Sequence, residues 1–455
     1  MNGKKACLIT FGCQMNEYDS GRLGALLAGG GWSFTDNKEE ADFIFFNTCS
    51  IREKAAVRVL NHLEQLRPLK KRRPGLIIGV GGCVAEQEGE SLLERTPWLD
   101  LVAGPQHLPE IPAMLEELLS KNGGLRQASL GQGERPAWSR ENMAALGYDA
   151  MGEIRPPARK SETCGFITIM QGCNNYCAYC VVPYLRGPEM SREPADIIEE
   201  VKRLLDEGVQ DLTLLGQNVN SYGRGLPGNP SFPALLEKVA ATGVRRLRFT
   251  TSHPKDFPPE LVRLFGSLAP LCESLHLPVQ SGSDRVLKAM GRIYTRDSYL
   301  RLVDDLRRAC PELALSTDII VGFPGETEKD FEETMSLIEA VGYDSMFSFQ
   351  YSDRPQTRSA AFDGKVPEDE KGRRLTALQA RQQEISQAKN QAQVGHILEV
   401  MVERSSGRHP GQLVGRARNF KMLHFNGPES LIGSFVPVRV SDASSASLRG
   451  EAVEG

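Results

Sequence analysis

Three cysteines stand close together near the middle of the chain, at Cys173, Cys177 and Cys180. Their spacing, Cys-x3-Cys-x2-Cys, lets one short loop bind three corners of a cubic iron–sulfur cluster. No fourth cysteine lies near enough in the sequence to complete the set, so one iron of such a cluster would stay open. An open iron can bind and activate a small molecule, whereas a site closed by four cysteines carries electrons or holds structure.

A zinc site is the alternative interpretation of this loop. Structural zinc usually has four ligands, and the candidate for a fourth is Cys164. The strand predicted over 165–170 would carry that cysteine roughly 20 Å away, at about 3.3 Å per residue. An iron–sulfur cluster therefore fits the spacing better.

The composition excludes several classes of protein. The chain has 455 residues, of which 40% are hydrophobic and 25% charged, as in ordinary globular proteins. It has no apolar run of the roughly 18 residues that a membrane helix needs, and no signal-peptide layout. We therefore expect a cytoplasmic protein without membrane contact. Its ten cysteines are expected to be ligands or buried residues rather than disulfides.

The N-terminal part alternates strand-like and helix-like segments up to about residue 145. Short continuous apolar strands between helices predict an α/β domain with a parallel sheet. The expected strands are Lys5–Phe11, Asp42–Asn47, Leu76–Val80 and Leu99–Ala103. The first three lead to Cys13, Cys49 and Cys83. Because ligands bind at the carboxyl ends of such strands, these cysteines are predicted to converge as a second set of three.

A linker is predicted from about 120 to 160, where Gly, Pro, Ser and charged residues are frequent. Strand–helix alternation then resumes over 160–388 and predicts a partial (β/α)6 barrel with its chemistry at the strand carboxyl ends. Its expected strands are Gly165–Met170, Asp211–Leu215, Arg246–Thr251, Ser274–Leu277, Leu313–Val321 and Ser345–Gln350.

The last part, 389–455, changes character after a polar helix predicted over Glu368–Gln393. Short strands separated by Gly, Ser and Pro predict a small antiparallel β-barrel. They are expected at Leu398–Glu403, Gly411–Gly415 and Phe435–Val440. The net charge of the whole chain is −4, so RNA contact would need a local patch. Such a patch is present in 389–425, which carries six Lys or Arg residues against two Glu.

The segment Gly172–Cys180 resembles the signature of radical S-adenosylmethionine (SAM) enzymes, with Tyr179 as its aromatic residue. The resemblance implies that the open iron binds SAM and that reduction yields a 5′-deoxyadenosyl radical. Leu214–Asn218 and Asp318–Thr327 match the superfamily's SAM-binding strand ends, although a Gly-Phe-Pro-Gly turn alone is weak support. The implied cofactor-binding residues are Tyr179, Gly216, Gln217, Asn218, Ser252, Asp318, Gly322 and Pro324.

Three N-terminal segments resemble the methylthiotransferase family within this superfamily: Gly12–Ser20, Asn47–Ala55 and Gly81–Glu86. The resemblance implies that Cys13, Cys49 and Cys83 hold an auxiliary 4Fe–4S cluster. The alternative is that the three cysteines are merely buried.

The residues beside the first two cysteines indicate a subgroup. Cys-Gln-Met-Asn at Cys13 and Asn-Thr-Cys-Ser-Ile-Arg-Glu around Cys49 resemble enzymes that methylthiolate carbon-2 of N(6)-dimethylallyladenosine beside the tRNA anticodon. His276–Met290 and Val182–Arg186 support this. Sister enzymes acting on threonylcarbamoyl-adenosine or on a ribosomal protein differ at the first motif. They stay open, as does a non-enzymatic iron–sulfur RNA-binding protein.

The resemblance also implies cofactors and partners. They are two 4Fe–4S clusters, SAM as methyl donor and radical source, the tRNA anticodon stem-loop, and an electron donor such as a flavodoxin or ferredoxin. A monomer is expected. A radical suits this substrate because the carbon-2 hydrogen of adenine is not acidic enough for a side-chain base.

The C-terminal barrel resembles the TRAM domain, an RNA-binding module. Its implied RNA contacts are Arg404, Arg408, Arg416, Arg418, Phe420 and Lys421. The alternative is a solvated basic face with Phe420 in the core.

Some positions fall outside these assignments. Tyr351–Ser359 departs from the family, which has Tyr-Ser-Pro-Arg-Pro-Gly-Thr-Pro-Ala there, so the resemblance implies no substrate contacts for that loop. His253 either lines the barrel mouth or has a structural role in a turn. Structural roles are expected for Cys7, Cys164, Cys272 and Cys310.

Overall fold

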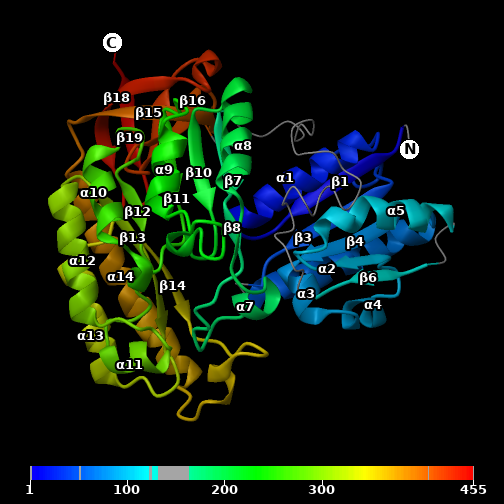
Figure 1. The fold of residues 1–455 in the computed structure, drawn as a ribbon, viewed down its shortest axis with the longest axis horizontal. Helices are drawn as coiled ribbons and strands as arrows, with labels where there is room; N and C mark the ends of the chain where they lie inside the picture. Colours follow the sequence, from blue (N-terminus) through cyan, green and yellow to red (C-terminus); the bar gives the residue numbers. More distant parts are fainter. Residues whose placement is uncertain (1–2, 51–52, 122–124, 132–162, 408, 454–455) are drawn as a thin grey trace. The chain divides into compact units, whose positions relative to one another are not determined.

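The computed structural model describes residues 3–50, 53–121, 125–131, 163–407 and 409–453 (Figure 1). The chain forms two compact units. The first comprises Met1–Arg159, Phe166–Asn174 and Val182–Glu200, and the second comprises Lys160–Gly165, Asn175–Val181 and Val201–Gly455. This division differs from the three predicted domains, because two segments expected in the central domain belong to the first unit.

A six-stranded parallel sheet of order β2-β1-β3-β4-β5-β6 forms the first unit. Its strands are β1 (Lys5–Thr10), β2 (Ser33–Phe34), β3 (Phe43–Thr48), β4 (Ile77–Gly82), β5 (Leu101–Ala103) and β6 (Gln127–Ser129). Its longer helices are α1 (Gln14–Gly29), α2 (Glu53–Arg72) and α5 (Ile111–Ser120), and its short ones are α3 (Cys83–Glu88), α4 (Ser91–Arg95) and α7 (Val182–Leu185). The predicted parallel sheet is confirmed.

Two edge strands of this sheet were not predicted. β2 has only two residues, and β6 extends the sheet into the range that the composition assigned to a linker. The rest of that predicted linker, from 132 onward, lies outside the described residues. A small antiparallel pair, β8 (Met170–Gln171) with β9 (Met190–Ser191), also belongs to the first unit.

The centre of the sheet is buried on both faces. Every residue of β3 and β4 is buried, as expected for a parallel sheet covered by helices. On one face, Val59 and Leu63 of α2 pack with Phe46 of β3 in a hydrophobic core. The apolar runs seen in the sequence are therefore core strands.

Most of the predicted partial barrel lies in the second unit, and the boundary between the units falls within its first strand, between Gly165 and Phe166. β7 (Cys164–Thr168), β10 (Asp211–Leu215) and β11 (Arg246–Phe249) form one sheet, and β12 (Ser274–His276), β13 (Ala314–Val321) and β14 (Ser345–Gln350) form another. A parallel bridge from Leu247 to Leu271 links the two sheets. The strands thus follow the chain order expected of a (β/α)6 barrel.

Helices separate these strands and lie outside them (Figure 1). They are α8 (Pro194–Asp206), α9 (Phe232–Ala240), α10 (Pro259–Ser267), α11 (Asp284–Ala289), α12 (Arg296–Ala309), α13 (Glu328–Val341) and α14 (Glu368–Gln391). Thr295 and Thr327 begin α12 and α13 with capping boxes. α13 ends at Gly342 in the left-handed conformation that favours glycine.

The C-terminal part is a closed barrel of order β15-β16-β17-β19-β18. Its strands are β15 (Ile397–Ser405), β16 (Gln412–Ala417), β17 (Met422–Asn426), β18 (Phe435–Ala443) and β19 (Leu448–Ala452). The sequence predicted β15, β16 and β18 but neither β17 nor β19. One pair, β17 with β19, is parallel rather than antiparallel. An odd number of strands cannot alternate direction all the way around a closed barrel, so one parallel pair is required.

Two arginines of β11 join this barrel to the strands of the second unit. Arg246 is fully buried and donates to the carbonyl oxygens of Arg416 and Glu399 at 2.8 and 2.7 Å. Arg248 donates to the carbonyl oxygens of Ala417 and Arg418 at 3.2 and 3.1 Å. These bonds give the terminal nitrogen atoms of the buried guanidinium groups acceptors, without which burial would be costly.

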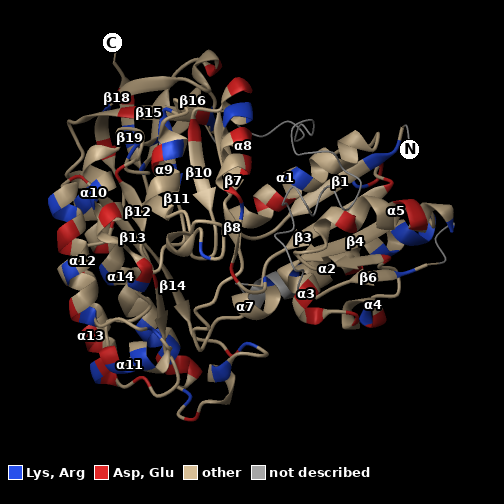
Figure 2. Cartoon of the chain, viewed as in Figure 1, with Lys and Arg blue, Asp and Glu red and all other residues tan. Residues whose placement is uncertain are grey.

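Charged residues gather on the outer helices, whereas the strands carry few of them (Figure 2). Blue and red stretches of ribbon both occur along α12, and the charged residues of α13 are mostly acidic, with Lys329 as its one basic residue. Within the described part of the chain, no helix combines the length and the apolarity needed to cross a membrane.

Two valines of α2 offer a matched test of the core in the first unit. Val59 is fully buried and Val57 is 56% exposed. We expect Val59→Ala to lower the free energy of unfolding by about 2 kcal/mol, since it leaves a cavity. Val57→Ala should change it by less than about 0.5 kcal/mol. Urea denaturation of both variants measures the difference, and equal values would contradict this packing.

Candidate metal and cofactor sites

The first unit brings Cys13, Cys49 and Cys83 to one edge of its sheet. Cys13 follows β1 and is the residue before α1. Cys49 directly follows β3, and Cys83 follows β4 as the first residue of α3. Since β1, β3 and β4 are adjacent parallel strands, their carboxyl ends share this edge.

Two glycines give these cysteines their close approach. Gly12 has φ +129°, and a Cβ atom there would lie 2.2 Å from Cβ of Cys49. Gly82 has φ +85°, and its Cβ would lie 2.4 Å from the carbonyl oxygen of Thr48. Only glycine fits at either position. The strand ends that carry the three cysteines thus approach one another closely and form a narrow cradle.

An amide network fixes the same edge. The thiol of Cys13 donates to Oδ1 of Asn16 at 3.2 Å, and Nδ2 of Asn16 donates to Oδ1 of Asn47 at 3.0 Å. Nδ2 of Asn47 donates back to the carbonyl oxygen of Asn16 at 3.0 Å. Asn16 and Asn47 lie inside two of the segments that suggested the family, but the sequence assigned them no role.

The pKa values of Cys13 and Cys83 are shifted in opposite directions. A hydrogen bond donated by the Cys49 thiol lowers the pKa of Cys13 to about 6, and the charge of Arg186 acts in the same direction. Burial raises the pKa of Cys83, and Arg186 opposes this rise. The site therefore favours one thiolate before a metal is bound, and thiolates are the form that binds iron.

The donor set suits an iron–sulfur cluster. Among the described residues, no group of three or more His, Cys, Asp or Glu side chains could hold a single metal ion. In a cluster each cysteine binds a different iron, so the sulfur atoms stand farther apart than they do around one ion. Three thiols in a glycine-lined cradle, with a buried arginine beside them, fit that group.

The second triplet lies in the loop between β8 and α7. The boundary between the two units runs through this loop: Cys173 belongs to the first unit, and Cys177 and Cys180 to the second. The amide of Cys173 donates to the carbonyl oxygen of Gly187 at 3.1 Å. The amide of Cys180 donates to the carbonyl oxygen of Cys177 at 3.0 Å.

A second buried arginine lies beside this triplet. In the second unit, Nη1 of Arg292 lies 3.6 Å from Sγ of Cys177. Arg292 also donates to the hydroxyl oxygen of Tyr294 at 2.9 Å and to the carbonyl oxygen of Pro278 at 2.8 Å. Sequence reasoning missed Arg292, although it lies two residues after the segment His276–Met290 that supported the resemblance.

Unpartnered polar atoms mark the carboxyl ends of β10 and β11. Asn218 and Ser252 are 0% and 4% exposed, and Oδ1 of Asn218 and Oγ of Ser252 have no hydrogen-bond partner. Oδ1 of Asn220 is also buried and has no hydrogen-bond partner. Buried polar atoms are normally satisfied, so these atoms suit a polar ligand such as the amino-acid part of SAM. Asn220 was not predicted.

The other predicted cofactor residues lie around the same barrel. Gly216 is buried and Gln217 partly buried at the end of β10, while Tyr179 packs in a cluster with Phe323 and Met290. Gly322 and Pro324 follow β13, and the amide of Gly322 donates to Oε1 of Glu326 at 2.9 Å. Their roles in SAM binding stay predictions.

Asp318 on β13 belongs to a small polar group. Oδ2 of Asp318 lies 3.4 Å from Nε2 of His276, and Nδ1 of His276 lies 2.9 Å from Oγ of Ser316. The ring of Phe347, which is 52% exposed, stands edge-on to His276. This group offers acceptors, a donor and an aromatic face on strands β12 to β14.

His253 has a structural role in a turn. Its Nδ1 accepts a hydrogen bond from the amide of Lys255 at 3.3 Å, and its ring stands edge-on to Tyr294. Burial and the charge of Arg292 lower the pKa of His253 to about 2, so the ring is neutral at physiological pH.

The loop Tyr351–Ser359, which departs from the family in sequence, contacts the loop that carries Cys177 and Cys180, and both lie in the second unit. The amide of Ser359 donates to the carbonyl oxygen of Ala178 at 3.0 Å, and Nη2 of Arg358 donates to that of Tyr176 at 2.9 Å. The hydroxyl of Tyr351 donates to Oδ1 of Asp353 at 2.8 Å. Side-chain bonds thus hold this loop where the family has two Pro residues and a Gly.

Several of the predicted RNA contacts have partners within the protein. Lys421 binds Asp344 at 2.8 Å and its side chain is 9% exposed, while Arg418 binds Glu273 at 2.8 Å. Arg416 binds Glu403 at 3.0 Å. Phe420 is 41% exposed, with the guanidinium groups of Arg416 and Arg248 at 4.3 and 5.2 Å from its ring.

The two remaining predicted RNA contacts are Arg404 and Arg408, and the structure describes only Arg404. Arg404 is exposed, and Arg408 lies outside the described residues. RNA binding by all six residues stays a prediction.

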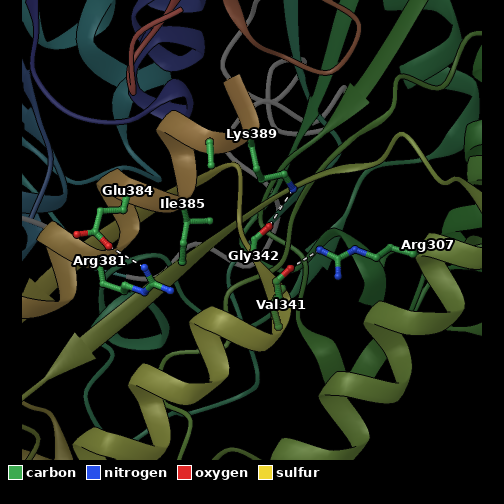
Figure 3. Close-up of a pocket in the computed structure, with 8 residues that line it drawn as sticks. Arg307, Val341, Gly342, Arg381, Glu384, Ile385 and Lys389 are labelled. Carbon is green, nitrogen blue, oxygen red and sulfur yellow. Dashed lines mark hydrogen bonds and ion pairs between the residues drawn. The ribbon is translucent and has the colours of Figure 1, made fainter. Parts of the chain in front are cut away.

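A cavity of about 420 Å³ lies elsewhere, beside α13 and α14 (Figure 3). Two basic side chains that line it bind carbonyl groups at the end of α13. Lys389 donates to the carbonyl oxygen of Gly342 at 2.9 Å, and Arg307 donates to that of Val341. Arg381 pairs with Glu384 at 2.7 Å. Basic side chains commonly satisfy the last carbonyl groups of a helix, so these contacts are structural.

Comparisons with known proteins agree with this arrangement. Residues 167–338 match the radical SAM superfamily, residues 391–453 match the TRAM domain, and residues 5–104 match an uncharacterized protein family, UPF0004. The radical SAM match implies SAM and a 4Fe–4S cluster as cofactors.

Solved structures share the fold at low sequence identity. A radical S-adenosylmethionine methyltransferase, TsrM, from Kitasatospora setae has a TM-score of 0.57 at 16% identity, over 79% of this chain and 74% of its own. The cobalamin-dependent S-adenosylmethionine radical enzyme OxsB has a TM-score of 0.51 at 13% identity, over 84% of this chain and 56% of its own.

Sequence relatives are much closer. A tRNA-2-methylthio-N(6)-dimethylallyladenosine synthase of Syntrophobacter fumaroxidans is 48% identical, over 97% of this chain and 94% of its own. The synthase of that name from Moorella thermoacetica is 45% identical, over 98% of both chains. The chain therefore belongs to the family of tRNA-2-methylthio-N(6)-dimethylallyladenosine synthases, which are radical SAM enzymes.

Proposed function

We propose that this protein adds a methylthio group to carbon-2 of N(6)-dimethylallyladenosine beside the anticodon of tRNA. The observation that carries the proposal is the convergence of Cys13, Cys49 and Cys83 on one sheet edge, in a chain that has a separate radical SAM triplet. Radical formation needs only one cluster. A second set of three thiols suits the delivery of sulfur.

Each triplet has its own task in this proposal. Cys173, Cys177 and Cys180 would hold the radical-generating 4Fe–4S cluster, and Cys13, Cys49 and Cys83 the auxiliary one. When bound, the clusters and SAM supply a 5′-deoxyadenosyl radical, the methyl group and the transferred sulfur.

The protein's residues bind and orient these groups. Asn218 and Ser252 present unpartnered buried oxygen atoms to the polar part of SAM. The predicted set of Tyr179, Gly216, Gln217, Asp318, Gly322 and Pro324 completes that site. Arg292 donates to Cys177 and would hold that ligand in place.

The C-terminal barrel would bind the tRNA anticodon stem-loop, through Arg404, Arg408 and the exposed ring of Phe420 among other residues. We further propose a flavodoxin or ferredoxin as electron donor, a monomeric state and a cytoplasmic location.

Iron content tests the two-cluster proposal. The reconstituted protein should bind about eight irons, and Cys49→Ala or Cys177→Ala about four each. Double substitution at both sites should leave almost none. Iron and sulfide analysis measures this, and about four irons in the unsubstituted protein would contradict the proposal.

SAM affinity tests the predicted pocket. We expect Asn218→Ala and Ser252→Ala each to weaken SAM binding roughly tenfold, the effect of losing about 1.4 kcal/mol of hydrogen bonding. Arg203→Ala, on α8, is the control and should leave the affinity unchanged. Equilibrium dialysis with labelled SAM measures all three. Unchanged affinity in both pocket variants would remove these residues from the site.

Nucleoside mass spectrometry tests the substrate. A deletion strain complemented with this chain should contain the 2-methylthio derivative of N(6)-dimethylallyladenosine in its tRNA, and Cys49→Ala or Cys177→Ala should abolish it. A methylthio group found instead on threonylcarbamoyl-adenosine or a ribosomal peptide would favour a sister activity. Failure to form 5′-deoxyadenosine from SAM under reduction would favour a binding protein.

A further inference from the structure

A buried arginine lies at the cysteine triplet of the first unit. Arg186 follows α7 and is 3% exposed. Its amide donates to the carbonyl oxygen of Val182 at 2.8 Å, and its carbonyl oxygen accepts from Nε2 of Gln106 at 3.0 Å. The main chain of this residue is therefore fixed through both its amide and its carbonyl group.

The guanidinium group of Arg186 contacts the cysteines and the groups that hold them. It donates a hydrogen bond to the sulfur of Cys83, and its charge also acts on Cys13. Nη2 lies 3.2 Å from Oδ2 of Asp19 and 3.5 Å from Oδ1 of Asn16, the same oxygen that accepts from the thiol of Cys13. One side chain thus links two of the three cysteines.

The guanidinium group has a further donor that no acceptor of the protein satisfies. Nη1 of Arg186 is buried and has no hydrogen-bond partner. A guanidinium carries five N–H donors, and a buried donor left unsatisfied costs about 1–3 kcal/mol. Sulfur atoms of a bound cluster would accept hydrogen bonds from this donor. Hydrogen bonds to the sulfur atoms are among the factors that set the reduction potential of a cluster.

The charge of the loaded site also favours a cation at the position of Arg186. Three thiolate ligands outweigh the 2+ charge of an oxidised 4Fe–4S core, so the loaded site is negative and lies near the buried carboxylate of Asp19. In a weakly screened interior, a cation in contact with this charge is strongly stabilising. Each electron added to the cluster makes it more negative, so the cation stabilises the reduced form most.

We propose that Arg186 is a positioning residue for the auxiliary cluster: it orients Cys83, donates hydrogen bonds to the sulfur atoms and raises the reduction potential. This inference rests on the proposed auxiliary cluster. It goes further by assigning the control of that cluster to a side chain outside the three ligand segments.

Arg192 provides a matched control in the same unit. It is also 3% exposed and lies on the same stretch of chain. Its Nη1 donates to Oε2 of Glu200 at 2.8 Å, to the hydroxyl oxygen of Tyr18 at 3.2 Å and to the carbonyl oxygen of Thr168 at 2.7 Å. The groups that act on its pKa include Tyr18, Glu200 and Asp196.

The test uses full-length protein in which Cys173, Cys177 and Cys180 are all changed to Ala, so that only the auxiliary cluster is loaded. Potentiometric titration followed by electron paramagnetic resonance gives its reduction potential. We expect Arg186→Gln to disfavour reduction tenfold or more, a shift of at least about 59 mV to more negative potential. Arg186→Lys, which keeps the charge, should recover most of this shift, and Arg192→Gln should show none.

A potential unchanged by Arg186→Gln, or an equal shift in Arg192→Gln, would overturn the inference. Pulsed electron paramagnetic resonance provides a second test that needs no change at Arg186. In the same triple variant labelled with [15N]arginine, the reduced cluster should show a 15N coupling, and its absence would also overturn the inference. If the triple variant binds no iron at all, the proposal that the first unit holds an auxiliary cluster is wrong. That result differs from a bound cluster whose potential does not depend on Arg186.

Discussion

The parallel order of β1, β3 and β4 is the constraint on which the auxiliary site depends. Neighbouring parallel strands end at one edge, so three cysteines separated by more than thirty residues each along the chain meet there. The approach is close enough that Gly12 cannot carry a side chain without meeting Cys49. The site therefore exists only if the sheet is complete, which ties its chemistry to the stability of the first unit.

The two triplets are built by different means. Cys173, Cys177 and Cys180 come from one loop, so sequence spacing alone brings them together, whereas the N-terminal three depend on tertiary structure. Each triplet nevertheless has a buried arginine beside one cysteine: Arg186 at Cys83 and Arg292 at Cys177. A cation that compensates thiolate charge is a common physical need of both sites.

The strands and the cysteine sets were predictable because their signals are local: apolar runs, ligand spacing and strand-end positions. The contacts of Arg186 and Asn16 were not, because they join residues about 170 positions apart and have no spacing signature. The parallel pair β17 and β19 was missed because β19 is a five-residue strand with little apolar pattern. Lys421 was predicted as an RNA contact from its charge and its place in a TRAM-like barrel, and its bond to Asp344 has no signal in the sequence.

The central claim is that one chain holds two iron–sulfur clusters, each on three cysteines. Anomalous diffraction at the iron edge, on crystals of the reconstituted protein, tests it most directly. The account predicts two separate iron peaks, one bounded by Cys13, Cys49 and Cys83 and the other by Cys173, Cys177 and Cys180. A single peak at the second triplet, with free thiols at the first, would contradict it.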